Sequence, residues 1–283
     1  MSFWRKSIRF IRGRRTAVCL NSSYFGFFAH AGFLAGLEEI GRPPDYLSGA
    51  SAGALVSGLY GAGYSPAEMS QLFLRKELAS AFREWSAPIR LARTLMAGRG
   101  ATGALSGKRA LDLLKQYVGD RRLEELDLPV AISVANLSRN RSEVKMEGPL
   151  AEYILASCAV PGMFAMQEVE GDHFWDGGIA DPAPIEHWLS MGEVDRIVVH
   201  IVDSNERPVG PYRPRFWSAM SKSHELISEE IVRLKTELAR KHGKRLDVII
   251  TRTPRLGPHK LAGGANNARL GHASALRHQN LFL

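Results

Sequence analysis

The sequence is poor in cysteine, in aromatic residues and in long apolar runs. Its 283 residues include two cysteines, Cys19 and Cys158, and 8% aromatic residues. Two cysteines can form neither a disulfide framework nor a four-ligand zinc site. No apolar run approaches the ~20 residues that a membrane-spanning helix needs. These features exclude a disulfide-rich scaffold, a cysteine zinc domain and a transmembrane helix. Because both cysteines lie in apolar runs, we expect two buried thiols.

Charge is distributed unevenly along the chain. The formal net charge is +8, but residues 1–16 carry +6, residues 17–204 carry −7 and residues 205–283 carry +9. An acidic middle argues against an enzyme that binds nucleic acid in a basic cleft, so no nucleic-acid partner is expected. Basic ends suit contact with an anionic surface such as lipid headgroups, although solvated ends would have the same composition.

The basic N-terminal segment, residues 1–16, lacks the apolar core of a secretory signal, because charges interrupt each apolar stretch. As a helix, residues 3–12 place aromatic and aliphatic side chains on one side and basic side chains on the other. This amphipathic pattern is typical of a peripheral membrane anchor. A frayed tail and an organelle transit peptide are the alternatives. We therefore expect a cytoplasmic protein that attaches peripherally to a membrane.

Short apolar runs alternate with helical patterns. Strands are predicted at residues 17–20, 46–48, 130–135, 197–202 and 248–250, and helices at residues 29–40, 52–60, 66–74 and 150–159. Continuously apolar strands separated by helices indicate a three-layer α/β/α domain with a mainly parallel central sheet. We expect this domain to span residues 17–255, with a loosely held C-terminal tail over residues 256–283.

Two further stretches have helical spacing. In residues 78–96, apolar side chains recur every three or four residues around Pro88, which fits helices packed on the body or a cap over a site. In residues 217–238, the apolar spacing forms a heptad pattern of about three repeats. We expect this second helix to pack on its own sheet, with contact to another copy in a homo-oligomer as the alternative.

The strongest chemical signal is the segment Gly49-Ala50-Ser51-Ala52-Gly53. It lies between a predicted strand and a predicted helix, which is the setting of a nucleophile elbow, a strained turn that carries a serine. Gly49 and Gly53 leave room where the turn and the helix crowd together, and the helix N-terminus favours developing negative charge. We therefore predict that Ser51 is a nucleophile.

A serine nucleophile needs a base to take its proton. None of the nine histidines has a neighbourhood that marks it as this base. Asp176-Gly177-Gly178 follows residues 169–175, which are predicted to form a hairpin, and the two glycines leave the carboxylate free to point inward. As an isolated pattern, Asp-Gly is a turn signal.

Three blocks in this order resemble the patatin-like phospholipases, a family of serine lipid acyl hydrolases. The blocks are G-x-S-x-G at residues 49–53, A-S-x-A-x-P-x-x-F at residues 156–164, and D-G-G at residues 176–178. Asp181-Pro182-Ala183-Pro184 is similar to the family's N-x-P stretch, and the resemblance spans about residues 17–202. It implies a patatin-like fold, a Ser51–Asp176 dyad without histidine, an acyl-enzyme and a lipid ester as substrate. No metal or cofactor is expected.

One block departs from the family pattern. The family's oxyanion loop is glycine-rich and precedes a helix with A-H-x-G, which is present here as residues 29–32. Where the family has glycines, this chain has bulkier residues that restrict positive φ angles, so Gly26 is expected to be the flexible point. The oxyanion hole is implied to consist of the backbone N–H groups of Ser22, Ser23, Tyr24, Phe25 and Ala52. The phenylalanines at 25, 27 and 28 are expected either to line an apolar entrance or to belong to the core.

The sequence thus predicts a carboxylic ester hydrolase of the phospholipase A or lysophospholipase type. Two alternatives remain open. One is a cytosolic short-chain esterase or thioesterase with little preference for lipid. The other is a protein of patatin fold that binds lipid or a partner without turnover, which the altered oxyanion loop favours and the presence of both Ser51 and Asp176 disfavours.

Overall fold

A computed structural model describes residues 15–81, 87, 89–90, 102–204, 216–257 and 261–282, with backbone alone at residue 79 and residues 216–225. Two predictions fall outside this part of the chain. The amphipathic helix at residues 3–12 is one, and most of the helical stretch at residues 78–96 is the other.

A central sheet, eight-stranded over the described residues, has the order β10-β9-β1-β2-β4-β8-β7, with β5 paired to β4. The five strands from β10 to β4 pair in parallel, whereas β5, β7 and β8 add antiparallel pairs. The bounds are β1 (Arg15–Leu20), β2 (Tyr46–Gly49), β4 (Val130–Asn136), β5 (Arg141–Lys145), β7 (Gln167–Val169), β8 (Asp172–Asp176), β9 (Val194–Asp203) and β10 (Arg245–Arg252). A short parallel pair joins β3 (Gly103–Leu105) to β6 (Gly162–Phe164).

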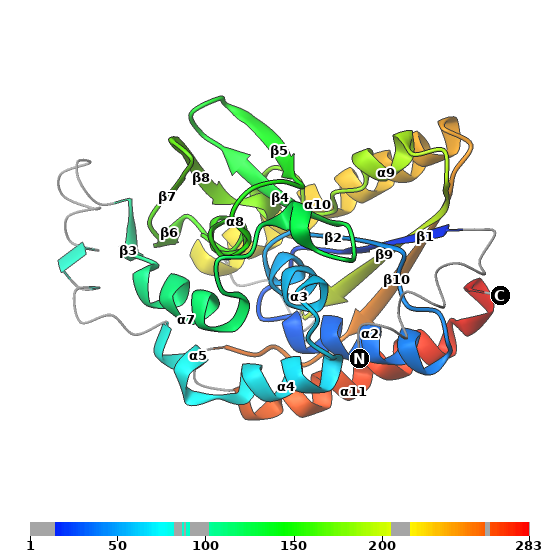
Figure 1. Ribbon diagram of the computed structural model, residues 1–283, viewed down its shortest axis with the longest axis horizontal. Coiled ribbons are helices and arrows are strands. Elements are labelled where there is room, and N and C mark those ends of the chain that lie inside the picture. The colour runs from blue at the N-terminus through cyan, green and yellow to red at the C-terminus, as the bar shows by residue number, and fades with distance from the viewer. Residues whose placement is uncertain are drawn as a thin grey trace.

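Helices cover both faces of the sheet (Figure 1), which confirms the predicted three-layer α/β/α architecture. The bounds are α2 (Phe27–Glu39), α3 (Ala52–Gly61), α4 (Pro66–Leu74), α5 (Lys76–Ala81), α7 (Lys108–Val118), α8 (Leu150–Ser157), α9 (Glu186–Ser190), α10 (Phe216–Lys241) and α11 (Gly264–Arg277). The 3-10 turns are η1 (Leu123–Glu125), η2 (Gly177–Ile179), η3 (Leu261–Gly263) and η4 (Gln279–Leu281). Strand side chains alternate between a larger core with α2, α3 and α8 and a smaller core with α9 and α10.

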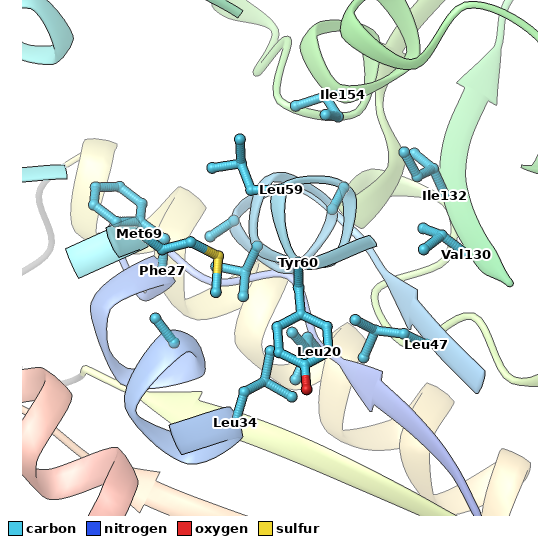
Figure 2. Close-up of a cluster of buried hydrophobic side chains, with 14 of the residues drawn as sticks. Leu20, Phe27, Leu34, Leu47, Leu59, Tyr60, Met69, Val130, Ile132 and Ile154 are labelled. Atoms are coloured by element: carbon cyan, nitrogen blue, oxygen red, sulfur yellow. The ribbon is translucent and has the colours of Figure 1, made fainter. Parts of the chain in front are cut away.

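Helix α3 lies in the middle of the larger core. Figure 2 shows it surrounded by side chains from strands β1, β2 and β4 and from α2 and α8. Its small residues allow this close packing: a Cβ atom on Gly58 would lie 2.4 Å from Cδ1 of Ile154, and one on Gly61 would lie 2.6 Å from Cγ2 of Val130. Because most residues of α3 are buried, the residue before its first turn, Ser51, has a fixed position at the end of β2.

The C-terminal segment is part of the domain, so the prediction of a loosely held tail at residues 256–283 is wrong. Helix α11 packs against α2 so closely that a Cβ atom on Gly32 would lie 1.9 Å from the carbonyl oxygen of Ala268. A Cβ atom on Gly271 would likewise lie 2.0 Å from the carbonyl oxygen of Ala29. The contact uses glycine and alanine rather than large apolar side chains, and apolar spacing therefore gives no sign of it.

Helix α10 forms as predicted, and its buried face matches the heptad face only in part, since Leu238 packs against the smaller core. Val232 and Ala239 pack in the smaller core, and Lys235 is buried beside them. Ile227 and Leu234, which belong to the predicted heptad face, are 55% and 53% exposed. The helix therefore contacts its own sheet through a strip that includes a lysine, and the homo-oligomer stays a prediction.

Candidate active site

Ser51 lies in the turn between β2 and α3 with φ 53° and ψ −118°, a conformation that L-residues rarely adopt. The two neighbouring glycines explain how this turn is formed. A Cβ atom on Gly49 would lie 2.3 Å from the carbonyl carbon of Gly53, and one on Gly53 would lie 2.0 Å from the carbonyl oxygen of Leu20. The turn thus has no space for a larger residue at either position.

The hydroxyl of Ser51 faces a buried carboxylate. Ser51 Oγ donates a 2.7 Å hydrogen bond to Oδ2 of Asp176, and the Gly178 N–H donates a 2.7 Å bond to Oδ1. Asp176 ends β8, is 3% exposed, and has its own N–H bound to the carbonyl of Ala159 at 3.0 Å. Both carboxylate oxygens are therefore occupied, one of them by the predicted nucleophile.

Burial raises the pKa of Asp176 from 3.8 to about 7, while the hydrogen bonds from Ser51 and Gly178 act in the opposite direction. An aspartate with its ordinary pKa is a weak base at neutral pH. A base is most effective when its pKa is close to the working pH. Desolvation therefore gives Asp176 the basicity that an exposed aspartate lacks.

The two glycines after Asp176 allow other parts of the chain to come close. A Cβ atom on Gly177 would lie 2.1 Å from the carbonyl oxygen of Ser133 in β4. One on Gly178 would lie 2.0 Å from Oγ of Ser22, which belongs to the loop at residues 21–26 that joins β1 to α2. This loop, called the β1–α2 loop below, thus packs directly on the turn that carries Asp176.

The β1–α2 loop contains most of the implied oxyanion donors. The Ser22 N–H already donates a 2.8 Å hydrogen bond to the carbonyl of Pro182, so it is directed toward Pro182. The amides of Ser23, Tyr24, Phe25 and Ala52 stay predicted donors.

The sequence predicts Gly26 as the flexible point of the β1–α2 loop, but the positive φ angle lies at Phe25. Phe25 has φ 53°, whereas Gly26 has the ordinary φ of −78°. Gly26 is needed for space instead, because a Cβ atom there would lie 2.1 Å from Oγ of Ser23.

The aromatic residues of this region divide between core and surface. Phe25, Phe27 and Phe28 are buried in the larger core, which confirms the core alternative. Tyr24 is 40% exposed, and the Arg255 guanidinium lies 5.2 Å from the centre of its ring. Tyr24 is therefore the aromatic side chain of the loop that faces outward.

Both cysteines are free thiols. Cys19 is fully buried, and Cys158 is partly buried with Sγ 3.2 Å from the carbonyl oxygen of Ser51. Burial raises the pKa of the Cys19 thiol to about 12 and raises that of Cys158 as well. Both side chains therefore stay protonated at neutral pH and are poor nucleophiles.

Sequence reasoning missed several residues that hold the site. Ser157 Oγ accepts the Ser51 N–H at 2.9 Å. This residue lies in the A-S-x-A block, so a motif contained it without indicating its role. The ammonium group of Lys235, in α10, binds the Asp181 carboxylate and the carbonyl of Ala183, which ties α10 to the turn after Asp176. Lys235 and Asp181 are 54 residues apart, and no local pattern connects them.

The described part of the chain contains no cluster of three His, Cys, Asp or Glu side chains arranged to hold a metal ion. Its helices are each either too short or too polar to cross a membrane.

The sequence model for patatin-like phospholipases matches residues 18–188, which is more than half of the chain. The chain belongs to the patatin-like phospholipase family. An uncharacterized NTE family protein of Mycobacterium tuberculosis is 30% identical over 202 residues, a match that covers 70% of this chain and 51% of that protein. The lysophospholipase nte1 of Emericella nidulans is 27% identical over 215 residues, covering 74% of this chain and 14% of that protein. The chain thus spans about half the length of the first of these relatives and 14% of the second.

Two solved structures are similar to this chain at low sequence identity. VipD from Legionella pneumophila is 15% identical with a TM-score of 0.48, and the match covers 94% of this chain and 67% of VipD. The type III effector ExoU is 12% identical with a TM-score of 0.43, and the match covers 95% of this chain and 54% of ExoU.

Proposed function

We propose that this protein is a serine lipid acyl hydrolase that cleaves carboxylic esters of phospholipids or lysophospholipids through a Ser51–Asp176 dyad. The observation that carries the proposal is the 2.7 Å hydrogen bond from Ser51 Oγ to a buried carboxylate of raised pKa. Family membership and the name lysophospholipase among the relatives support a lipid hydrolase in general. The Ser51–Asp176 dyad is the more specific part of the proposal, and family membership alone does not support it.

In the proposed mechanism, Asp176 takes the proton from Ser51 Oγ as this oxygen attacks the ester carbonyl carbon. The negative charge that develops on the carbonyl oxygen is stabilised by the N–H of Ala52, at the first turn of α3, and by amides of the β1–α2 loop. The alcohol departs with the proton from Asp176 and leaves an acyl-enzyme. Water, deprotonated by Asp176, then attacks the acyl carbon, and the Ser51 oxygen departs with the proton from Asp176, which releases the fatty acid and restores the dyad.

Exposed apolar side chains on two segments that contact one another beside Asp176 favour a lipid substrate. Tyr24 in the β1–α2 loop is 40% exposed, and Ile179, three residues after Asp176, is 44% exposed. These two segments are in contact through Ser22 and Gly178. An acyl chain or a lipid surface would cover these side chains when the ester reaches Ser51.

Peripheral attachment to an anionic membrane through residues 3–12 is part of the same proposal. It rests on the amphipathic pattern of that segment and on its basic residues. The same proposal includes a cytoplasmic location.

A fluorophosphonate probe tests the proposal. The intact mass of the wild-type protein is expected to increase by one adduct, and that of Ser51→Ala is expected to stay unchanged. Folded wild type without an adduct, both with and without vesicles, would contradict turnover and favour the lipid- or partner-binding alternative.

Substrate preference then distinguishes a lipid acyl hydrolase from a short-chain esterase. Lysophosphatidylcholine and phosphatidylcholine of long acyl chain are expected to be cleaved faster than a short-chain ester such as p-nitrophenyl butyrate. The reverse order would favour the short-chain esterase. Both assays include Ser51→Ala as the blank.

A further inference from the structure

Two buried histidines and a threonine lie in line behind the β1–α2 loop. Thr251 comes from β10, His200 from β9 and His30 from α2, and all three are at most 1% exposed. Thr251 Oγ1 is 2.8 Å from Nε2 of His200, and Nδ1 of His200 is 2.9 Å from Nδ1 of His30. The ring of Phe33 stacks on His200 with centroids 4.0 Å apart. No step of the hydrolysis described above uses these residues.

At the end opposite Thr251, this line of side chains contacts the β1–α2 loop. Nε2 of His30 is 3.0 Å from the carbonyl oxygen of Asn21 and 3.2 Å from Oγ of Ser23. The next amide, the N–H of Ser22, donates to Pro182. Asn21 is also held from β9, since its N–H donates to the His200 carbonyl and its Oδ1 accepts from the Val202 N–H.

The groups at the two ends of this line determine which atom donates and which accepts in each hydrogen bond. A carbonyl oxygen only accepts, so Nε2 of His30 carries the hydrogen that it shares with Asn21. Both rings are neutral, because burial lowers the pKa of His30 to about 3 and lowers that of His200 as well. Nδ1 of His30 is therefore bare and accepts from Nδ1–H of His200. Nε2 of His200 is bare in turn and accepts from the Thr251 hydroxyl.

We propose that Thr251, His200 and His30 form a hydrogen-bond relay of fixed direction that ends on Asn21 and positions the β1–α2 loop. His30 is thus a positioning residue for the hydrolase. The hydrogen bonds in such a line polarise one another, so a change at one end is felt at the other. A glycine-rich loop can adopt backbone conformations that bulkier residues disfavour. In this loop, which is poor in glycine, side-chain contacts to Asn21 and Ser23 hold the backbone in position instead.

The proton pattern is tested by nuclear magnetic resonance on protein labelled with ¹⁵N-histidine at pH 7. Long-range ¹H–¹⁵N correlations are expected to show opposite tautomers, with the hydrogen on Nδ1 in His200 and on Nε2 in His30. The His30→Gln and His200→Gln variants assign the two rings among the nine histidines. Two rings in the same tautomer, or a doubly protonated ring, would overturn the relay. This measurement needs no enzymatic activity.

The effect on the loop is tested with a matched pair of threonines. Thr251→Val removes the donor to His200. Thr253→Val removes a buried hydroxyl that has no hydrogen-bond partner among the described residues. Thr251→Val is expected to shift the backbone amide resonances of Ser22 and Ser23 and to slow fluorophosphonate labelling about two- to ten-fold, the rate equivalent of one ordinary hydrogen bond. Thr253→Val is expected to do neither.

The outcomes separate this inference from the proposed function, on which its catalytic part rests. If the wild type is not labelled by the probe, the proposed function fails, and the tautomers and amide shifts still decide the relay. If the wild type is labelled but Thr251→Val leaves both the amide resonances and the labelling rate unchanged, the relay does not position the loop. If Thr251→Val does not fold, the tautomers of the wild type decide.

Discussion

The backbone N–H of Ser51 donates a 2.9 Å hydrogen bond to the hydroxyl of Ser157, the last residue of α8. This bond joins the strained turn of the predicted nucleophile to a helix 106 residues further along the chain. The next residue, Cys158, lies beside the same turn, with its thiol 3.2 Å from the Ser51 carbonyl. The end of α8 therefore supports the conformation of Ser51 through its backbone N–H and carbonyl, while Asp176 contacts its hydroxyl.

Replacing Ser157 with alanine is expected to slow fluorophosphonate labelling of Ser51 about ten-fold or more. The variant leaves the Ser51 N–H without its acceptor, and a buried unpaired donor costs about 1–3 kcal/mol. Cys158→Ala is the matched control, because a thiol is a weak donor and the Ser51 carbonyl also accepts from the Leu55 N–H. Equal labelling rates for the two variants would show that Ser157 does not support the nucleophile.

The Asp176→Asn variant is expected to lose ester hydrolysis while its thermal midpoint falls by no more than a few degrees. The amide has nearly the shape of the carboxylate but cannot take the Ser51 proton. Hydrolysis of a lysophospholipid and the unfolding midpoint are measured on the same preparation. Hydrolysis close to that of the wild type would mean that another residue is the base.

The pH dependence of hydrolysis is expected to follow the ionisation of Asp176. Because its pKa is raised to about 7, kcat/KM should fall about ten-fold for each pH unit below this value and level off above it. An aspartate of ordinary pKa would give a flat profile from pH 5 upward. A flat profile would therefore contradict the role of burial in activating this base.

Folding stability is expected to change with pH in the opposite direction. The pKa of Asp176 is higher in the folded protein than its ordinary value of 3.8, so the folded state binds this proton more tightly. The contribution of Asp176 to stability is thus greatest below about pH 4 and is lost as pH rises through about 7. The difference between the unfolding midpoints of wild type and Asp176→Asn, measured from pH 4 to pH 8, isolates this contribution. A constant difference would mean that the pKa is not raised.

Substitution of Gly178 is expected to disturb the dyad through Ser22. The Cβ atom in Gly178→Ala would lie 2.0 Å from Oγ of Ser22 and 3.0 Å from Oδ1 of Asp176, so hydrolysis should fall more than ten-fold. The double variant Gly178→Ala/Ser22→Gly removes most of this clash and is expected to recover part of the rate. Gly192→Ala, where a Cβ atom meets nothing within 4 Å, is the control. A double variant no better than Gly178→Ala would contradict this contact.

Deletion of residues 1–14, which stops before β1, is expected to weaken binding to vesicles that contain anionic lipid about ten-fold or more. The segment contains five basic residues, and each contributes about 1 kcal/mol near an anionic surface. Co-sedimentation with anionic and with zwitterionic vesicles measures the effect. The quadruple variant Arg5→Gln/Lys6→Gln/Arg9→Gln/Arg12→Gln separates charge from apolar contact. Unchanged co-sedimentation after the deletion would refute a membrane role for this segment.

Local patterns predicted most of the elements around the site. The strand before Ser51 and the helix after it were predictable because apolar runs, glycines and helix-forming residues act on their neighbours in the chain. Helix α11 was not, since it packs through Gly271 against the backbone of α2 and has few large apolar residues. The buried face of α10 is predicted only in part for a related reason: Lys235 is buried because it pairs with Asp181, which a hydrophobic pattern does not represent.

The sequence by itself determined the α/β layering, the serine turn and the order of the blocks, since these depend on residues close together in the chain. Only the tertiary structure decided which groups meet. It brings Ser51 within hydrogen-bond distance of Asp176 and raises the pKa of that carboxyl by burial. It also aligns His30 with His200, 170 residues away. Distances across a sheet and the loss of water around a charge depend on packing between distant segments, and no local pattern contains them.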